Sequence, residues 1–334
     1  MTHFKKLSLI FAAILLSLMP LTGLTSVAAQ EDLKEVHLML DWYPNANHIP
    51  IYEAIEKGYF KEAGIDLKIE MPAETNDPIR LVGAKQTDIG ISYPGVLSKA
   101  VAEGVPVKAI GSLVQQRMDV IMYKTESGIK GAKDLVDKKV GFASDPISEA
   151  VVQSMVTNEG EDPSKVDMID VGWDLIPALA TDKVDAVIGA YVNHEYLMLQ
   201  DQGYNMGYFD FADFGIPESQ ELIFVASDEL IESDPDLLKA FMTALQKGFD
   251  AAKEDPEGAL EVLFAKEENA YTLDKDIEAK SWEMLQDFMV KDGSFGAMDV
   301  DQYDAYVKWL FETGSIAKEV KGADVVHPVL NGEN

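Results

Sequence analysis

The hydrophobic pattern of residues 36–114 alternates between short apolar runs and segments with helical spacing. The apolar runs predict strands at 36–40, 66–71, 87–93 and 107–114. The amphipathic segments between them predict helices at 50–60, 77–86 and 95–104. Because strands that alternate with helices are typical of parallel sheets covered by helices, this part of the chain indicates an α/β fold.

The same alternation starts again after residue 115. We predict further strands at 116–124, 138–144, 166–172, 184–190 and 221–227. Between them we predict helices at 131–137, 147–160, 175–182 and 193–203. The last third of the chain opens with the capping sequence "SDPDLLKAF" from Ser233 and is nearly all helical.

Two cycles of strands and helices predict a two-lobed α/β protein in which each lobe is a sheet flanked by helices. The chain would cross between the lobes twice, near 113–122 and 221–227. This assigns residues 30–118 and 222–334 to lobe one and residues 119–221 to lobe two. Because no Gly/Ser-rich linker separates the two parts, we expect a tight hinge.

The first 29 residues have the pattern of a secretory signal peptide. Lys5 and Lys6 precede an apolar segment, and small residues including Ala28 and Ala29 close the stretch. The apolar segment is short for a membrane anchor, and Pro20 interrupts it. We therefore expect residues 1–29 to be removed and the mature protein to be exported, either periplasmic or extracellular.

The chain has a formal net charge of −30 and no cysteine. The negative charge argues against nucleic acid or an anionic membrane as a partner. Without cysteine the chain can form neither disulfides nor zinc–thiolate sites, and it cannot carry a lipid anchor on a cysteine. The dinucleotide, P-loop and serine-hydrolase motifs are also absent from the sequence, so it indicates no cofactor and no metal.

Polar and aromatic side chains follow several of the predicted strands. If the sheets are parallel, the carboxyl ends of these strands meet at a cleft between the lobes, where α/β proteins hold ligands. The aromatic rings and scarce cations there suit a flat, neutral or weakly basic heteroaromatic ligand better than a phosphate or sulfonate. The residues that we expect to contact the ligand are Asp41, Trp42, Asn45, His48, Tyr93, Pro94, Pro146, Ile147, Trp173, Tyr191, Asn193 and Glu195.

Several of these residues also have a structural interpretation. Asp41 could brace its own loop by accepting backbone N–H bonds. Trp42 and Trp173 could fill gaps in the core, and His48 could cap or hinge the helix that follows it. A carboxylate such as that of Glu195, in the first turn of a helix, is favoured by the helix dipole alone.

Several segments of the sequence resemble one family. "DWYPNANHIPIY" from Asp41, "TDIGISYPG", "MIDVGWDL" and "GAYVNHE" from Gly189 occur in the same order in the thiamine-pyrimidine-synthase-like branch of the ABC-transporter substrate-binding proteins. The resemblance implies a type II periplasmic-binding-protein fold without enzymatic activity. It also implies delivery of the ligand to an ABC permease and its ATPase. For a carrier that diffuses between ligand and permease, we expect a monomer.

The resemblance further implies a ligand such as N-formyl-4-amino-5-aminomethyl-2-methylpyrimidine. On this interpretation Glu195 accepts a hydrogen bond from the exocyclic amine, and Trp42 and Tyr191 stack on the ring. Asn45 or Asn193 would satisfy the formyl amide. The sequence departs from the family's pyrimidine synthases because it lacks their cysteine-rich iron motif. After the strand at 138–144 it reads "ASDPISE" where a glycine–proline loop is expected.

Two alternatives to a pyrimidine carrier stay open at this point. A binding protein of the same fold could hold riboflavin, or a sulfonate or nitrate, although an anion site would need Arg or Lys at the strand ends. An exported enzyme could instead make or trim the pyrimidine, with Asp41 and Glu195 as acid and base.

Overall fold

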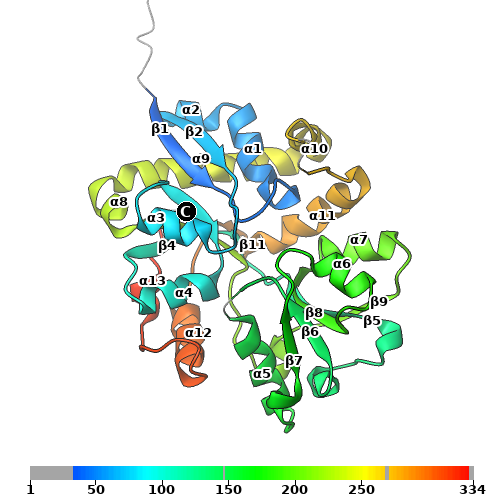
Figure 1. Cartoon of the computed structure of the whole chain (residues 1–334). Helices are drawn as coiled ribbons and strands as arrows, with labels where there is room; N and C mark the ends of the chain where they lie inside the picture. The colour runs from blue at the N-terminus through cyan, green and yellow to red at the C-terminus, as the bar shows by residue number, and fades with distance from the viewer. Residues whose placement is uncertain (1–32, 146, 268–270, 331–334) are drawn as a thin grey trace, which may run out of the picture. The chain divides into compact units, whose positions relative to one another are not determined.

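The computed structural model describes residues 33–145, 147–267 and 271–330. The predicted signal peptide, residues 1–29, and the predicted site residue Pro146 lie outside these described residues. The described part of the chain contains two five-stranded sheets with helices packed against them (Figure 1).

The first sheet has the strand order β2-β1-β3-β10-β4. Strand β1 pairs in parallel with β2 and β3, whereas β10 is antiparallel to β3 and β4. Strands β3 and β10 are buried along their whole length, as expected of central strands covered on both faces. The strands are β1 (Lys34–Met39), β2 (Ile65–Glu70), β3 (Ile89–Ser92), β4 (Val107–Val114) and β10 (Leu222–Ser227).

The second sheet has the strand order β7-β6-β8-β5-β9. Strand β6 is parallel to β7 and β8, whereas β5 is antiparallel to β8 and β9. The short edge strand β9 was not predicted from the sequence. The strands are β5 (Asp119–Lys124), β6 (Lys139–Phe142), β7 (Asp167–Asp170), β8 (Ala186–Tyr191) and β9 (Met206–Phe209).

Both sheets are mixed, so the prediction of parallel sheets is wrong for β5 and β10. Parallel neighbours need a crossover connection within one sheet, usually a helix. Here β4 leads directly into β5, and the return crossing leads directly into β10. Because these connections carry the chain from one sheet to the other, the strands beside them run against their neighbours. Strand β5 begins at Asp119 and β10 begins at Leu222. The assignment of residues 30–118 and 222–334 to lobe one and of residues 119–221 to lobe two stays a prediction.

Helices lie on both faces of the sheets. In the second sheet, α5 lies on one side and α6 and α7 on the other (Figure 1). In the first, the long helix α9 packs on α1 and α2. Gly248 of α9 allows this close approach, because an added Cβ would meet the carbonyl oxygen of Pro50. The helices up to the return crossing are α1 (Ile49–Glu56), α2 (Tyr59–Glu62), α3 (Asp77–Gly83), α4 (Pro94–Ala102), α5 (Ser148–Asn158), α6 (Leu175–Ala180) and α7 (Glu195–Asp201).

The part of the chain after the return crossing is mostly helical, as predicted. Helix α9 begins where the Asp234 side chain accepts a hydrogen bond from the N–H of Leu237, which confirms the predicted cap. The helices are α8 (Asp228–Ser233), α9 (Pro235–Glu254), α10 (Pro256–Phe264), α11 (Lys275–Phe288), α12 (Val300–Glu312) and α13 (Gly322–Val325). A hairpin of β11 (Val290–Lys291) and β12 (Ser294–Phe295) interrupts them. Short 3-10 turns are η1 (Ala46–His48), η2 (Thr125–Ser127), η3 (Ala132–Leu135), η4 (Pro163–Lys165) and η5 (Ala212–Phe214).

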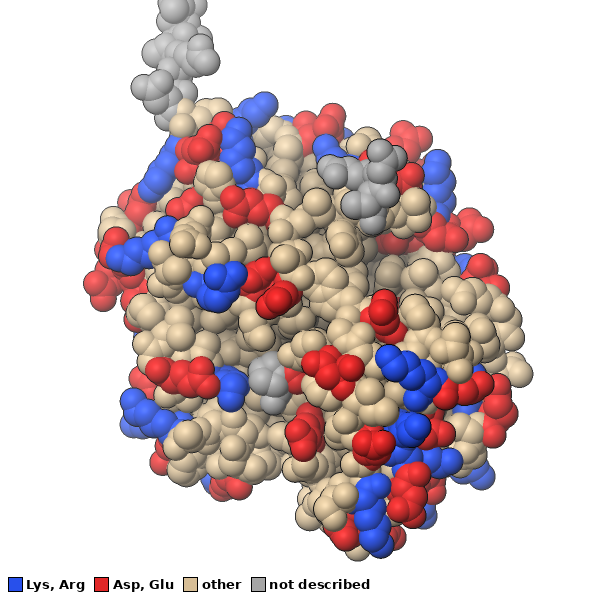
Figure 2. All heavy atoms as spheres, in the orientation of Figure 1, with Lys and Arg blue, Asp and Glu red and all other residues tan. Residues whose placement is uncertain are grey.

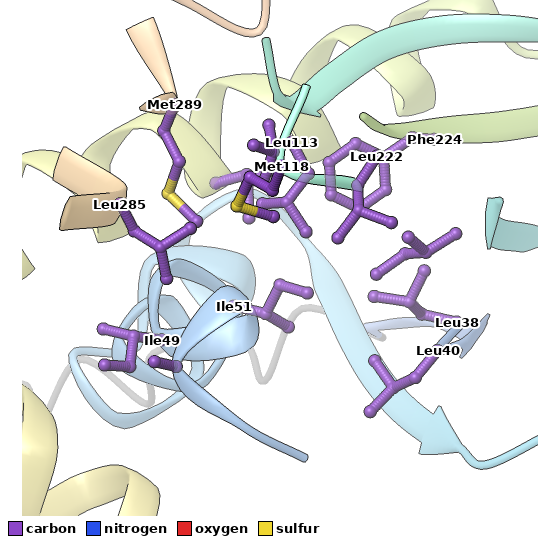
Figure 3. Packing of buried hydrophobic residues seen from close by; sticks show 14 of the residues in the cluster. Leu38, Leu40, Ile49, Ile51, Leu113, Met118, Leu222, Phe224, Leu285 and Met289 are labelled. Carbon is purple, nitrogen blue, oxygen red and sulfur yellow. The ribbon is translucent and has the colours of Figure 1, made fainter. Parts of the chain in front are cut away.

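A hydrophobic core continues from the first sheet toward the crossings. Figure 3 shows Met118, from the first crossing, beside Leu113 of β4 and Leu222 of β10. Side chains of β1, α1 and α11 contribute to the same cluster. Burying a side chain such as that of Met118, which is fully buried, contributes about 1.5–3 kcal/mol, so this packing stabilises the first crossing.

The two crossings, residues 115–118 and 217–221, are tied to each other by one carboxylate. The backbone N–H of Glu221 donates to the carbonyl of Val114 at 2.9 Å. Its Oε2 accepts from the N–H of Met118 at 2.6 Å and from that of Asp119 at 2.9 Å. A short hinge held in this way agrees with the lack of a flexible linker in the sequence.

Acidic side chains are spread over the face of the molecule drawn in Figure 2, with lysines and arginines between them. Such a distribution is that of a solvated acidic surface rather than of a site for one ligand. Among the described helices, none combines the length and apolar character that crossing a membrane requires.

Candidate ligand cavity

A cavity of about 130 Å³ lies where the two sheets face each other across the hinge. Its walls come from the ends of β1, β3, β6 and β8 and from both crossings. An apolar cavity of about 150 Å³ is known to hold one benzene ring, so this space fits a ligand of about one ring. The predicted site residues that line it are Asp41, Trp42, Asn45, Tyr93, Pro94, Ile147, Trp173, Tyr191 and Glu195.

Two indoles meet across the cavity. The ring centroids of Trp42, after β1, and Trp173, after β7, are 3.9 Å apart. Two rings can hold a third ring between them only if they are about 7 Å apart, which is twice a van der Waals contact. The two indoles are closer than this, so they cover the cavity together and do not enclose a ring between them. Tyr43 packs edge-on to both indoles at 5.9 and 5.8 Å and also lies 5.4 Å from Tyr271.

Thr75 links the two lobes next to these indoles. The indole N–H of Trp173 donates to the Thr75 hydroxyl at 3.3 Å, and that hydroxyl donates to the carbonyl of Ala143 at 3.3 Å. Thr75 is buried and belongs to the loop between β2 and α3, whereas Trp173 and Ala143 follow strands of the second sheet. These bonds hold the lobes in a closed arrangement over the cavity.

Asp41 is held by two side chains at the end of β1. It is 2% exposed, and its Oδ1 accepts from His48 Nε2 at 2.9 Å while its Oδ2 accepts from the Tyr93 hydroxyl at 3.2 Å. The backbone N–H of Asn45 donates to His48 Nδ1 at 3.2 Å, so the proton of the imidazole is on Nε2. Both ring nitrogens of His48 are therefore used inside the protein.

His48 and Asn193 do not line the cavity, although both were predicted to contact the ligand. His48 is fully buried behind Asp41. Asn193, 1% exposed, donates to Asn47 Oδ1 at 3.0 Å and to Ser281 Oγ at 2.8 Å. These two bonds connect the start of α7 to η1 and α11, so Asn193 helps to hold the lobes together. Its own Oδ1 has no hydrogen-bond partner within the described residues.

His194 and Glu195 form an ion pair at the start of α7. Glu195 Oε1 is 3.2 Å from His194 Nδ1, and Glu195 Oε2 accepts from the N–H of Tyr191 at 2.8 Å. Burial lowers the pKa of His194, but the Glu195 carboxylate and then Glu278 outweigh it and raise the pKa to about 9. Burial raises the pKa of Glu195, but His194 and the backbone N–H outweigh it and leave that pKa lowered. Both groups are therefore charged at neutral pH.

Sequence reasoning missed the acidic groups of the hinge that also line the cavity, above all Asp119 and Glu221. Burial, followed by the nearby Glu221 carboxyl, raises the pKa of Asp119 well above its usual value. Burial likewise raises the pKa of Glu221. One feature of the sequence could have indicated both residues. Asp119 begins the apolar run "DVIM" and Glu221 begins the apolar run "ELIFVAS", and each run adjoins a predicted crossing.

The cavity also contains one arginine, which the sequence interpretation did not place there. Arg117 donates from Nη2 to the carbonyl of Pro217 at 3.1 Å and to Ser219 Oγ at 2.6 Å. Its guanidinium lies over the ring of Phe211, 5.1 Å from the centroid. Arg117 therefore binds the return crossing.

Within the described residues, no cluster of His, Cys, Asp or Glu is arranged to hold a metal ion.

Comparison with known proteins agrees with a ligand carrier. The family model described as NMT1/THI5 like matches residues 45–259. The chain is 34% identical to the formylaminopyrimidine-binding protein of Halalkalibacterium halodurans, over 93% of this chain and 94% of that protein. It is 29% identical to the 4-amino-5-hydroxymethyl-2-methylpyrimidine phosphate synthase of Legionella pneumophila, over 70% of this chain and 75% of that enzyme.

Solved structures identify the fold. The alkanesulfonate-binding protein SsuA of Xanthomonas axonopodis pv. citri, bound to MOPS, matches with a TM-score of 0.69 at 12% identity, over 88% of this chain and 98% of that one. A Candida albicans protein with the generic periplasmic binding protein fold matches with a TM-score of 0.64 at 15% identity, over 90% of this chain and 99% of that one. The two-lobed α/β periplasmic-binding-protein fold predicted from the sequence is therefore confirmed.

Proposed function

Because this chain belongs to the NMT1/THI5 like family, we propose that it is the solute-binding component of an ABC importer for a thiamine-related aminopyrimidine. The ligand would be N-formyl-4-amino-5-aminomethyl-2-methylpyrimidine or a close relative. The observation that carries the proposal is the one-ring cavity between the lobes, with the Trp42 indole and the Glu195 carboxylate in its wall.

The chemistry of the cavity wall fits an aminopyrimidine. Such a ring has two π faces and an edge that carries an amine donor. We assign the Glu195 carboxylate, kept ionised by His194, to accept from that amine, as carboxylates do from the N4 amine of cytosine. One face of the ring would lie against Trp42 and the other toward Tyr191, a type of contact that contributes about 1–3 kcal/mol per ring.

The alternative ligands fit the cavity less well. Riboflavin has three fused rings and a ribityl chain, which exceed a space of about 130 Å³. A sulfonate needs a cation that is free to bind it, whereas Arg117 already donates to Pro217 and Ser219, and His194 is paired with Glu195. The Glu195 carboxylate in the same wall, which is ionised at neutral pH, would repel an anion.

We also propose that the protein is a carrier and not an enzyme. The family contains both kinds, since relatives named as pyrimidine phosphate synthases match the chain at 29% identity or below. Asp41 and Glu195 were the acid–base pair considered from the sequence. Both oxygens of Asp41 are engaged by His48 and Tyr93, which supports a positioning role instead.

The partners follow from this role. The protein would act outside the cytoplasm, after removal of residues 1–29, as a monomer without a lipid anchor on cysteine. It would pass its ligand to an ABC permease driven by an ATPase. Closure around the ligand would depend on the hinge at residues 115–118 and 217–221, because these are the connections between the two sheets.

The proposal is tested by isothermal titration calorimetry of the purified protein with the formylated aminopyrimidine, riboflavin and an alkanesulfonate. We expect binding of the aminopyrimidine only. The variant Glu195→Gln should lose about 1–3 kcal/mol of binding free energy, since a neutral amide replaces a charged acceptor. Trp42→Ala should lose about 1–3 kcal/mol by removal of the stacking surface.

A matched control for this test is Glu159→Gln, which makes the same charge change at an exposed residue on the end of α5. Its affinity should equal that of the unaltered protein. If Glu195→Gln and Trp42→Ala also bind with unaltered affinity, the site is wrongly assigned. If the flavin or the sulfonate binds instead, the ligand class is wrong.

A further inference from the structure

Three aromatic side chains lie between the cavity and solvent. We call them the aromatic cover and define them as Trp42, Tyr43 and Trp173. The two indoles line the cavity with their ring centroids 3.9 Å apart, and Tyr43 packs edge-on to both. All three side chains are half-buried, so they separate the cavity from solvent without belonging to the interior.

Trp173 reaches the aromatic cover from a different sheet than the other two residues. It follows β7 of the second sheet, whereas Trp42 and Tyr43 follow β1 of the first. Its indole N–H donates at 3.3 Å to the hydroxyl of Thr75, which lies in the loop between β2 and α3. That hydroxyl is itself fixed, because it donates to the carbonyl of Ala143 at 3.3 Å. The indole of Trp173 is therefore held in place over the cavity.

Core packing does not account for an indole at position 173. Within the described residues, none of the aromatic cover belongs to the two clusters of buried hydrophobic residues that stabilise the sheets. The cavity wall and the other members of the cover are instead what Trp173 contacts. Its large side chain is thus explained better by the ligand site than by the fold.

The aromatic cover sets an upper limit on the size of the ligand. The cavity of about 130 Å³ fits about one ring. Trp42 and Trp173 leave no gap between them through which a second ring could extend, because a ring would need about 7 Å between its two neighbours. A second ring attached to a bound pyrimidine would therefore meet the indole of Trp173.

We infer that Trp173 is a specificity-determining residue, whose indole excludes pyrimidines that carry a second ring on their 5-methylene group. This inference rests on the proposed function, because the pyrimidine must bind in the same cavity. It goes further by naming the residue that separates one-ring from two-ring ligands.

Charge would not produce this exclusion. The second ring of thiamine is a cationic thiazolium, and the cavity wall contains the ionised carboxylate of Glu195. The chain as a whole has a net charge of −30. Electrostatic attraction therefore favours thiamine, so its rejection has to come from the lack of space.

The test is isothermal titration calorimetry of the full chain with three pyrimidines. These are N-formyl-4-amino-5-aminomethyl-2-methylpyrimidine, with one ring, thiamine, with a cationic second ring, and 4-amino-5-anilinomethyl-2-methylpyrimidine, with an uncharged second ring. We expect the unaltered protein to prefer the one-ring ligand at least about thirtyfold, because overfilling a packed site is unfavourable. Trp173→Ala should reduce this preference about tenfold or more for both two-ring ligands, since the indole no longer occupies their space.

A matched control removes an aromatic side chain elsewhere. Phe311→Ala alters an exposed residue of α12 that does not line the cavity, and it should keep the preference of the unaltered protein. A loss of preference in Phe311→Ala as large as that in Trp173→Ala would refute a specific role of the indole.

A second variant covers the case in which Trp173→Ala does not fold. Trp173→Phe keeps an aromatic ring beside Trp42 but is smaller and lacks the N–H that donates to Thr75. It should reduce the preference for the one-ring ligand about threefold or more. An unchanged preference in folded Trp173→Phe, as judged by circular dichroism, would overturn the inference.

The remaining outcomes separate this inference from the proposed function. If the unaltered protein binds none of the three pyrimidines, the proposed function fails. If it binds all three equally, the pyrimidine site stands and the size limit is refuted. If folded Trp173→Ala binds none of them, the indole is needed for the pyrimidine itself and the inference is wrong. A gain for thiamine without a gain for the anilinomethyl ligand would show selection by charge and would also contradict it.

Discussion

At the scale of single residues, Asp41 explains how the first strand presents a ligand site. Its carboxylate is buried, and it accepts from His48 on one side and Tyr93 on the other. The two bonds fix the backbone at the point where β1 turns toward η1. Trp42, the next residue, is thereby held in the cavity wall.

Asp41→Asn should therefore destabilise the protein by about 1–3 kcal/mol, because the new amide places a donor opposite one of two existing donors. Urea denaturation followed by circular dichroism measures the difference. The control is Asp174→Asn, an exposed residue before α6 whose side chain does not cap that helix. Equal stability of the two variants would refute the role of Asp41.

The residues that the sequence could and could not place differ in the range of their contacts. Trp42, Tyr93 and Tyr191 follow or end apolar runs, so their position at the strand ends could be read from the local pattern. Asn193 could not be placed in this way, because its partners Asn47 and Ser281 lie 146 and 88 residues away. Only the folded arrangement shows that the side-chain nitrogen of Asn193 donates to both of these residues.

At the scale of elements, α7 and α11 meet through a charged contact. His194 before α7 pairs with Glu195, and its Nε2 lies 3.8 Å from Glu278 Oε1 on α11. The other oxygen of Glu278 accepts from the N–H of Ala46 at 2.7 Å, in η1. The imidazolium thus joins helices that pack on different sheets, next to the ligand cavity.

Stability should fall as the pH rises through about 9. The pKa of His194 in the folded protein is about 9, above the ordinary value of 6.5. A raised pKa contributes stability that is fully present below pH 6.5 and is lost as the pH rises through the folded pKa. Thermal unfolding measured from pH 6 to pH 10 should show this loss in the unaltered protein.

His194→Gln should remove most of that pH dependence, because glutamine cannot carry the charge. The matched control is His327→Gln, an exposed residue near the end of the described chain, which should keep it. The same slope of stability against pH in His194→Gln and the unaltered protein would show that the α7–α11 contact is not the cause.

The elements themselves were largely predictable, and their directions were not. Apolar runs located β4 at 107–114 and helical spacing located α5 and α6 to within a few residues. The antiparallel direction of β5 and β10 depends on how the crossings connect the two sheets, which a local pattern does not contain. Strand β9 is short and lies at a sheet edge with Tyr208 43% exposed, so it has no continuous apolar run.

At the scale of the whole molecule, the two sheets close a small acidic cavity between them. The lobes are held together by Thr75 with Trp173 on one side and by Asn193 with Asn47 on another. The Glu221 carboxylate fixes the two crossings at the hinge. The net charge of −30 belongs mainly to the solvated surface, whereas the acids that matter for the ligand are the few that the lobes enclose.

The central claim is that the cavity selects a single aminopyrimidine ring. The most direct measurement exposes the protein to an equimolar mixture of the aminopyrimidines, riboflavin and an alkanesulfonate, removes unbound molecules, and identifies by mass spectrometry what the denatured protein releases. We predict an aminopyrimidine. Release of the flavin or the sulfonate, or of no pyrimidine at all, would contradict the account.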